Sequence, residues 1–211
     1  VVIKKDLPLY RQDPFWFFRE QVWSIKKQIW GWSGFIISKD WYILTNKHVV
    51  SDESSTYTVI MKSWEEIDAQ IIAIDKMTDL AILKINTTKT LTPLKVVETS
   101  ESLKIWEFVI AIWNALWEFQ NSVSFGVLSW KNRTIEAWNI YQIEKLTWLL
   151  QTDAAINPWN SWGPLINLNW EVIWINTAIS WDWQWLGFSI PLTQKKIDYI
   201  LNSIKKYNTI K

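Results

Sequence analysis

The sequence predicts an all-β fold, arranged as barrels or as a sandwich, with one helix near the C-terminal end. Short runs of Val, Ile, Leu, Phe and Thr recur along the chain with turn residues between them. FIISKDWYILTN and PLINLNWEVIWIN each place a short turn between two such runs, which is typical of a β-hairpin. After Pro191, the segment LTQKKIDYILNSIKKY places Ile197, Ile200, Leu201 and Ile204 on one face of an amphipathic helix. We expect this helix to lie against a barrel.

The strands fall into two comparable groups, which the polar stretch TSESLK at residues 99–104 separates. This division favours a pair of barrels, each with its own core. We therefore divide the chain into an N-terminal segment at 1–30, a first barrel at 31–98, a second barrel at 99–192 and a C-terminal helix at 193–211.

Composition restricts the possible functions. The chain has 211 residues and is 49% hydrophobic, enough for a sizeable core, and its formal charge of +1 gives no field that would attract nucleic acid or an anionic membrane. It has no cysteine and one histidine, which excludes disulfides, thiolate metal sites and sites with several histidines. We expect no metal and no cofactor. No apolar run approaches the roughly 20 residues that span a bilayer, and Val1 does not begin a signal-peptide pattern.

Tryptophan is unusually frequent and glycine unusually rare. The chain has 19 Trp and 5 Gly, whereas an average composition gives about 15 Gly. Trp follows a turn-forming residue at Asp40-Trp41, Ser63-Trp64, Ser129-Trp130 and Asn169-Trp170, and recurs in the loop SWDWQWLG at 180–187. Such turn positions require positive φ, which glycine adopts freely and tryptophan does not.

Two hypotheses explain these tryptophans. They are either true indoles displayed for stacking, as in a carbohydrate- or peptide-binding module, or the source reads the UGA codon as glycine, so that the natural protein has glycine where Trp is written. The preference for turn positions favours the second hypothesis, because stacking surfaces have no reason to select turns.

Three residues could together perform nucleophilic catalysis. His48, the only histidine, ends the strand-like ILTNKHVV, Asp79 lies in DKMTDLAILKI, and Ser161 lies in the turn-rich INPWNSWGPL. A lone histidine is more often structural, but a serine hydroxyl needs an imidazole base, which in turn needs a carboxylate to orient it. In this hypothesis Ser161 is the nucleophile, His48 acts first as the base and then as the acid, and Asp79 orients the imidazole. Backbone N–H groups at Trp159, Asn160 and Ser161 would form the oxyanion hole.

With glycine read for tryptophan, several long motifs occur in the order of a known family. From about residue 31 to 192, GWSGFIISKDWYILTNKHVV, DKMTDLAILKI, EFVIAIWN, SVSFGVLSW, LLQTDAAINPWNSWGPLINLNWEVIWINTAI and GFSIP resemble the protease domain of HtrA/Deg-type, trypsin-like serine proteases. The resemblance implies two chymotrypsin-like β-barrels, with the His48, Asp79 and Ser161 triad in the cleft between them.

The same resemblance implies an activity and partners. It implies hydrolysis of unfolded or misfolded polypeptides in protein quality control and the stress response, with a preference for small aliphatic side chains. Thr177, Ala178 and Ile179 are implied to bind substrate through main-chain hydrogen bonds. A homotrimer assembled through the N-terminal segment, with YRQDPFWFF as the candidate stretch, and a bacterial periplasmic or cell-envelope location are also expected, without nucleic acid. No PDZ domain, common in this family, is present in this chain, and a membrane anchor outside it remains open.

Two other functions remain as alternatives. A catalytically inactive, protease-like scaffold that binds unfolded peptides is favoured if Trp159 and Trp162 are true tryptophans, because their indoles would then occupy the cleft. An aromatic-rich glycan-binding module is the third alternative.

Overall fold

The structure is a computed structural model that describes residues 2–6, 9–12, 19–23, 31–52, 55–75, 78–115, 119–138, 143–156, 163–179, 187–207 and 209–210. These residues form fifteen β-strands, one α-helix and two short 3₁₀ segments. The prediction of a mainly β protein with a C-terminal helix is confirmed.

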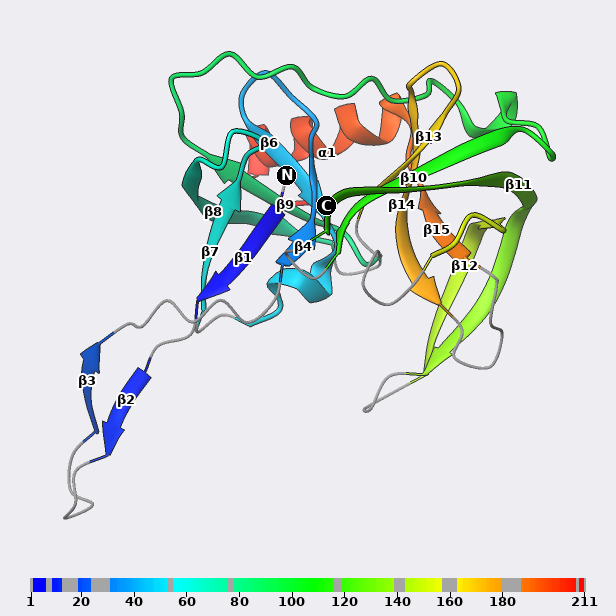
Figure 1. Cartoon of the computed structure of the whole chain (residues 1–211). Coiled ribbons are helices and arrows are strands. Elements are labelled where there is room, and N and C mark those ends of the chain that lie inside the picture. Colours follow the sequence, from blue (N-terminus) through cyan, green and yellow to red (C-terminus); the bar gives the residue numbers. More distant parts are fainter. Residues whose placement is uncertain are drawn as a thin grey trace.

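The first barrel is a seven-stranded antiparallel sheet that curls until it is nearly closed (Figure 1). Its strands, in spatial order, are β4 (Gly31–Ser33), β1 (Val2–Asp6), β7 (Thr56–Ile60), β8 (Glu66–Ile74), β9 (Ala81–Ile85), β6 (Tyr42–Thr45) and β5 (Phe35–Ile36). The two end strands, β4 and β5, are separated in the chain by Gly34 alone, so the ends of the sheet must lie together. A Cβ atom on Gly34 would lie 3.1 Å from Ile3 and Ile43 side-chain atoms, so this close approach favours glycine.

The second barrel is closed by hydrogen bonds all the way round. Its order is β10 (Phe108–Ala115), β11 (Phe119–Trp138), β12 (Ile143–Thr152), β15 (Gly187–Pro191), β14 (Val172–Ile179) and β13 (Pro164–Asn167), and β13 pairs back onto β10. The prediction of two β-barrels is therefore confirmed. The exact boundaries drawn from the sequence remain predictions.

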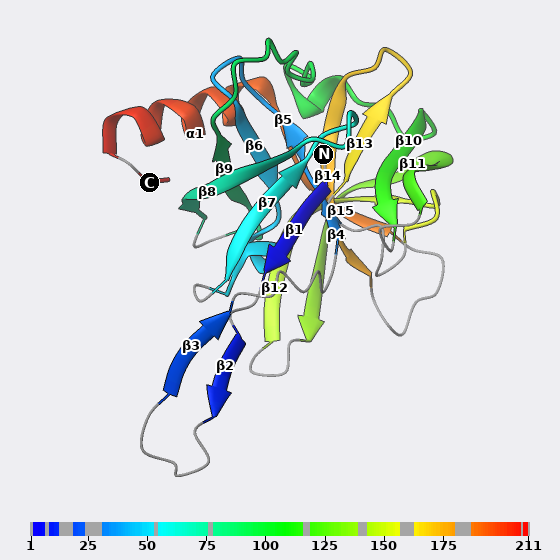
Figure 2. The same ribbon diagram turned by 60° about the vertical axis from the view of Figure 1, so that its left-hand side comes forward.

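The C-terminal helix holds the two barrels together. Helix α1 (Gln194–Tyr207) begins after Thr193, whose hydroxyl accepts a hydrogen bond from the Lys196 backbone at 3.3 Å. It runs along one side of the molecule (Figures 1 and 2). Its buried Ile197, Ile200 and Ile204 belong to one apolar cluster with residues from both barrels, among them Ile82, Ile166 and Ile190. Each buried isoleucine contributes about 1.5–3 kcal/mol of hydrophobic free energy.

The structure has strands ahead of residue 35, where the sequence patterns predicted none. β1 pairs with β7, fifty or more positions later in the chain, so no local pattern of alternating apolar and polar residues predicts this strand. β2 (Leu9–Gln12) and β3 (Arg19–Trp23) form a separate two-stranded sheet that projects away from both barrels (Figure 2). Residues 13–18 lie outside the described residues, and the role of YRQDPFWFF in assembly stays a prediction.

The turn tryptophans adopt the conformation that the glycine hypothesis requires. Six described non-glycine residues have positive φ; one is Asn132, and the others are Trp41 (66°), Trp64 (64°), Trp106 (75°), Trp148 (63°) and Trp170 (61°). The Trp64 N–H closes its turn onto Met61 O at 2.9 Å, and the Trp170 N–H closes its turn onto Asn167 O at 3.0 Å. Left-handed backbone is strained for an L residue with a bulky side chain. These angles support the hypothesis that the natural protein has glycine there.

Two other tryptophans behave differently. The prediction of a turn at Ser129-Trp130 is wrong, because β11 continues through both residues and Trp130 does not have positive φ. Its ring instead lies under the Arg133 guanidinium, 4.7 Å from the ring centroid. Trp174 is buried inside the second barrel, where its indole Nε1 has no hydrogen-bond partner among the described residues. A buried N–H without an acceptor is costly, so this position also suits a residue without an indole.

We predict that Trp64→Gly and Trp170→Gly each stabilise the protein. Both side chains are more than 60% exposed, so little packing is lost, and relief of the left-handed strain contributes about 1 kcal/mol per site. Urea unfolding followed by circular dichroism measures the change. Trp130→Gly is the matched control and should destabilise, because glycine weakens a strand interior. Loss of stability in both turn variants would refute the glycine explanation.

Candidate catalytic site

The structure brings His48 and Asp79 together at one end of the first barrel. β6 ends at Thr45, and the chain turns through a 3₁₀ segment, Lys47–Val50, whose Val49 and Val50 are buried and anchor it. His48 lies on this segment. Its ring Nδ1 is 2.7 Å from Asp79 Oδ2, and its backbone N–H donates to Asp79 Oδ1 at 3.1 Å. The predicted pairing of these two residues is thus present in the structure.

Asp79 lies just before β9 and is 8% exposed. Its backbone oxygen accepts a hydrogen bond from Lys47 N at 3.2 Å, and its Oδ2 also accepts one from Asn46 Nδ2 at 2.9 Å. Burial raises the pKa of the Asp79 carboxyl, but the hydrogen bond and charge of His48, the Asn46 amide and the His48 backbone N–H together outweigh burial. The net pKa is lowered, and Asp79 is therefore ionised at neutral pH.

The His48 side chain is 44% exposed, so part of the imidazole is accessible. When Nδ1–H donates to Asp79, the neutral ring has its lone pair on Nε2. This tautomer can accept a proton from a nearby hydroxyl. The pair therefore has the chemistry of a general base.

Ser161, Trp159 and Asn160 lie outside the described residues, but the chain on each side of them is firmly held. On the upstream side, Thr152 Oγ1 donates to Val127 O at 2.8 Å, and Val127 N donates to Asp153 Oδ1 at 2.7 Å. On the downstream side, Gly163 O accepts a hydrogen bond from Asn176 N at 3.1 Å. Thr152, Asp153 and Gly163, which are described, are thus hydrogen-bonded to strands of the second barrel.

Gly163 also packs tightly against β10. A Cβ atom at Gly163 would lie 1.7 Å from Ile112 O, so no larger side chain fits this contact. The close contact therefore fixes Gly163, the first described residue after Ser161, against β10.

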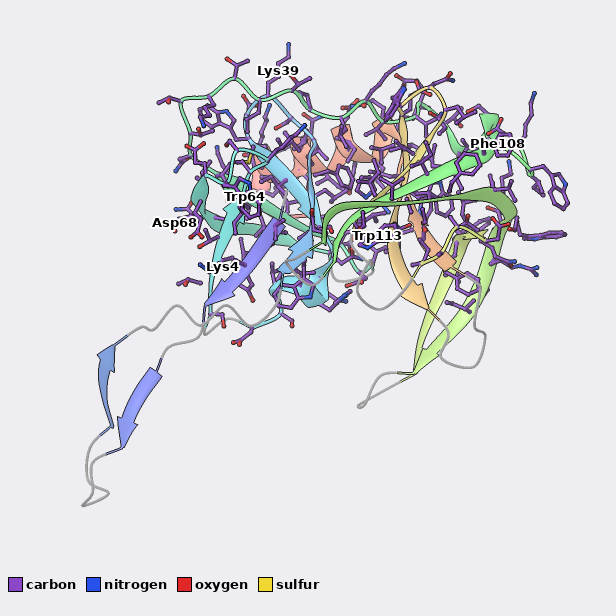
Figure 3. The ribbon with its side chains drawn as sticks, viewed as in Figure 1. Lys4, Lys39, Trp64, Asp68, Phe108 and Trp113 are labelled. Atoms are coloured by element: carbon purple, nitrogen blue, oxygen red, sulfur yellow. The ribbon has the colours of Figure 1, made fainter. Side chains whose placement is uncertain are left out.

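Polar contacts connect this end of β10 to the His48 turn. Asn114 N donates to Ser33 Oγ at 2.9 Å, across the junction of the two barrels, and Thr45 Oγ1 donates to Ser33 O at 2.9 Å. Trp113, the neighbour of Asn114, lies between the barrels in Figure 3. β10 and β6, the strand that precedes His48, are therefore both hydrogen-bonded to Ser33 at the end of β4.

Thr177, Ala178 and Ile179 form the end of β14. On one edge, Ala178 pairs with Phe188 and Ile179 with Gly187, after a register shift that follows Asn176. On the other edge, the ladder to β13 ends at the Pro164 and Ile175 pair, so residues 177–179 have no strand partner there among the described residues. Such an edge can accept an extended peptide. Substrate binding by these three residues stays a prediction.

Asn46 was not identified from the sequence, although a signal was present. An amide at the end of the apolar run YILT, two positions before the histidine, has to be buried with the strand and therefore needs a hydrogen-bond partner. The structure shows it fully buried, with Asp79 as that partner. Ser33 and Thr45 were missed because their roles depend on contacts between distant segments.

No helix within the described part of the chain combines the length and the apolar character that a membrane crossing requires.

Residues 32–175 match the family of the trypsin-like peptidase domain. Protein HhoA of Synechocystis sp. is 41% identical over 164 residues, which are 78% of this chain and 41% of HhoA. A protein of Chlamydia trachomatis serovar D, named "Probable periplasmic serine endoprotease DegP-like", is 39% identical over 175 residues, which are 81% of this chain and 33% of the relative. The chain spans less than half the length of these relatives.

Among solved structures, "HtrA-type protease AlgW with decapeptide" superposes with a TM-score of 0.72 at 27% identity. The superposition covers 99% of this chain and 65% of that chain.

We predict that Asp79 makes stability depend on pH in the acid range. Because its folded-state pKa lies below the ordinary value of 3.8, its contribution is complete above that value and is lost as the pH falls through the folded-state pKa. In urea unfolding from about pH 5 to pH 2, Asp79→Asn should flatten this dependence. Asp68→Asn removes an exposed carboxylate of β8 and should keep it. Equal slopes for Asp79→Asn and the unmodified chain would contradict the prediction.

Proposed function

Because the chain belongs to the trypsin-like peptidases, as an HtrA/DegP-type serine protease domain, we propose that it is a serine endopeptidase that cleaves unfolded or misfolded polypeptides. The observation that carries this proposal is the His48 Nδ1 to Asp79 Oδ2 contact of 2.7 Å, on a carboxylate that is buried and ionised. A polarised imidazole with an exposed face is what activation of a serine requires.

The proposed reaction proceeds through an acyl-enzyme. Ser161 Oγ attacks the peptide carbonyl while His48 Nε2 takes its proton, and Asp79 stabilises the imidazolium that forms. Backbone N–H groups in the segment Trp159, Asn160 and Ser161 stabilise the oxyanion. His48 then protonates the leaving amine as the C–N bond breaks. A water molecule, deprotonated by His48, hydrolyses the Ser161 ester and releases the acid.

The proposed substrate is an extended polypeptide, and the edge of β14 supports this choice. Residues 177–179 offer backbone groups on an edge without a strand partner among the described residues. A segment that pairs there must have free backbone groups of its own, which unfolded chains have and folded proteins largely lack. The solved structure of AlgW is one with a decapeptide, and binding of a peptide by that protein agrees with the proposal.

The cellular setting is proposed from the relatives. A role in protein quality control and the stress response, a periplasmic or cell-envelope location and a homotrimer follow from the family resemblance, and the DegP-like relatives are named as periplasmic. The second candidate is an inactive scaffold that binds unfolded peptides. Trp159 and Trp162 on either side of Ser161 favour it, if the natural protein has tryptophan at both positions.

Fluorophosphonate labelling separates the two candidates. An active serine protease reacts with the probe at Ser161, and Ser161→Ala and His48→Ala should abolish labelling. Both variants should lower hydrolysis of casein by about 10⁴- to 10⁶-fold while casein still binds. Absence of labelling in a folded protein with glycine at 159 and 162 would support the scaffold.

We predict that the double variant Trp159→Gly, Trp162→Gly labels faster than the chain as written. Glycine allows the backbone N–H at position 159 to turn towards the oxyanion and removes an indole from beside the scissile bond. Restoring one oxyanion-hole donor increases kcat by about 10²- to 10³-fold. Trp130→Gly, on the exposed side of β11, should leave the labelling rate unchanged. Equal rates for the double variant and the unmodified chain would contradict the prediction.

A further inference from the structure

Asp79 Oδ2 accepts hydrogen bonds from two side chains of the same turn. His48 Nδ1 lies 2.7 Å from this oxygen, and Asn46 Nδ2 lies 2.9 Å from it. We propose that Asn46 is a positioning residue, whose amide fixes the rotation of the Asp79 carboxylate and thereby the orientation of His48. This inference rests on the proposed serine protease function and adds a fourth side chain to its machinery.

The position of Asn46 is itself well determined. It joins β6 to the 3₁₀ segment with extended backbone, φ −85° and ψ 150°, and its carbonyl oxygen accepts a hydrogen bond from Val49 N at 3.3 Å. Asn46 is fully buried. A buried side chain on a short hydrogen-bonded turn has few alternative rotamers, so its amide can hold a neighbour in place.

Backbone and side-chain hydrogen bonds both connect this turn to Asp79. From the backbone, Lys47 N donates to Asp79 O at 3.2 Å and His48 N donates to Asp79 Oδ1 at 3.1 Å. The bonds from the side chains of Asn46 and His48 both end on Oδ2. Rotation of the carboxylate would break these three bonds to its oxygens together. Of these three bonds, His48 donates two and Asn46 donates the third.

The chemical type of the donor matters as well. An amide N–H stabilises the ionised carboxylate without a positive charge of its own, so Asp79 keeps its full charge for the imidazolium. A lysine or arginine at this position would form an ion pair with Asp79 and compete with His48 for that charge. An asparagine therefore orients the carboxylate and leaves its charge available to His48.

The experiment compares two forms of the chain that both carry glycine at 159 and 162, one with Asn46→Ala and one unmodified at Asn46. Loss of the positioning bond should lower kcat for a peptide ester by about 10- to 100-fold, with KM changed by less than about two-fold. The second readout is the NMR signal of the His48 ring recorded against pH, which needs no assignment because the chain has one histidine. Its low-pH inflection reports ionisation of Asp79 and should move up by about one pH unit.

Asn167→Ala is the matched control. Asn167 Nδ2 donates to Glu171 Oε2 at 3.0 Å, which is the same kind of bond at the turn between β13 and β14. This variant should leave kcat, KM and the His48 titration unchanged. Asn46→Asp covers the case in which the alanine variant does not fold, because it keeps the size of the side chain. It places two carboxylates within hydrogen-bond distance, so the pair should retain a proton to higher pH and add an inflection to the His48 titration.

A His48 titration and a kcat in the folded Asn46 variants that match those of the unmodified chain would overturn the proposal. Failure of the serine protease function gives a different result. In that case the unmodified chain neither labels nor hydrolyses the ester, while the effect of Asn46 on the low-pH inflection is still measured.

Discussion

The burial of one charged carboxylate governs the architecture around the candidate site. An ionised aspartate that is 8% exposed is stable only where donors replace the water it has lost. The fold meets this demand with a single short turn, which directs the His48 backbone N–H and the side chains of Asn46 and His48 at the Asp79 carboxylate. The His48 imidazole is one of these donors. Its orientation is therefore a consequence of solvating the carboxylate within the protein.

Contacts at the junction of the barrels connect the surroundings of Asp79 to the second barrel. Ser33 ends β4, accepts a hydrogen bond from Asn114 of β10 and one from Thr45 of β6, and so joins the two barrels at one residue. Gly163 rests against the neighbouring backbone of β10 at a distance that excludes a side chain. The buried face of helix α1 belongs to an apolar cluster that includes residues of both barrels. Relative displacement of the barrels would therefore break polar bonds and expose apolar surface together.

Local patterns in the sequence predicted most of the fold, and non-local pairing accounts for what they missed. The hairpins around Trp41 and Trp170 and the helix at 194–207 have signals within a few residues, so they could be predicted. β1 could not, because its partners lie far along the chain. The turn predicted at Ser129-Trp130 was wrong, because a serine before a tryptophan resembles a turn only when that tryptophan is read as glycine.

The candidate site was predicted only in part, because some of its contacts join segments that lie far apart in the sequence. His48 stood out as the single histidine, whereas Asp79 is one of 21 acidic residues and was singled out by the family motif around it. Asn46 was missed, although an amide at the end of an apolar run was a signal that it would be buried with a hydrogen-bond partner. Because both barrels contribute to the junction, no segment on its own contains the information that Ser33, Thr45 and Asn114 meet there.

The shortness of β4 and β5 has a consequence for how the first sheet meets other extended chains. These strands end the first sheet, and they are only three and two residues long and adjacent in the sequence. An edge so brief offers almost no template for a foreign strand, which protects the sheet from misdirected aggregation. The edge at residues 177–179 of β14, which has no strand partner among the described residues, lies in the second barrel. Pairing of another extended chain with the end strands of the first sheet is thus disfavoured.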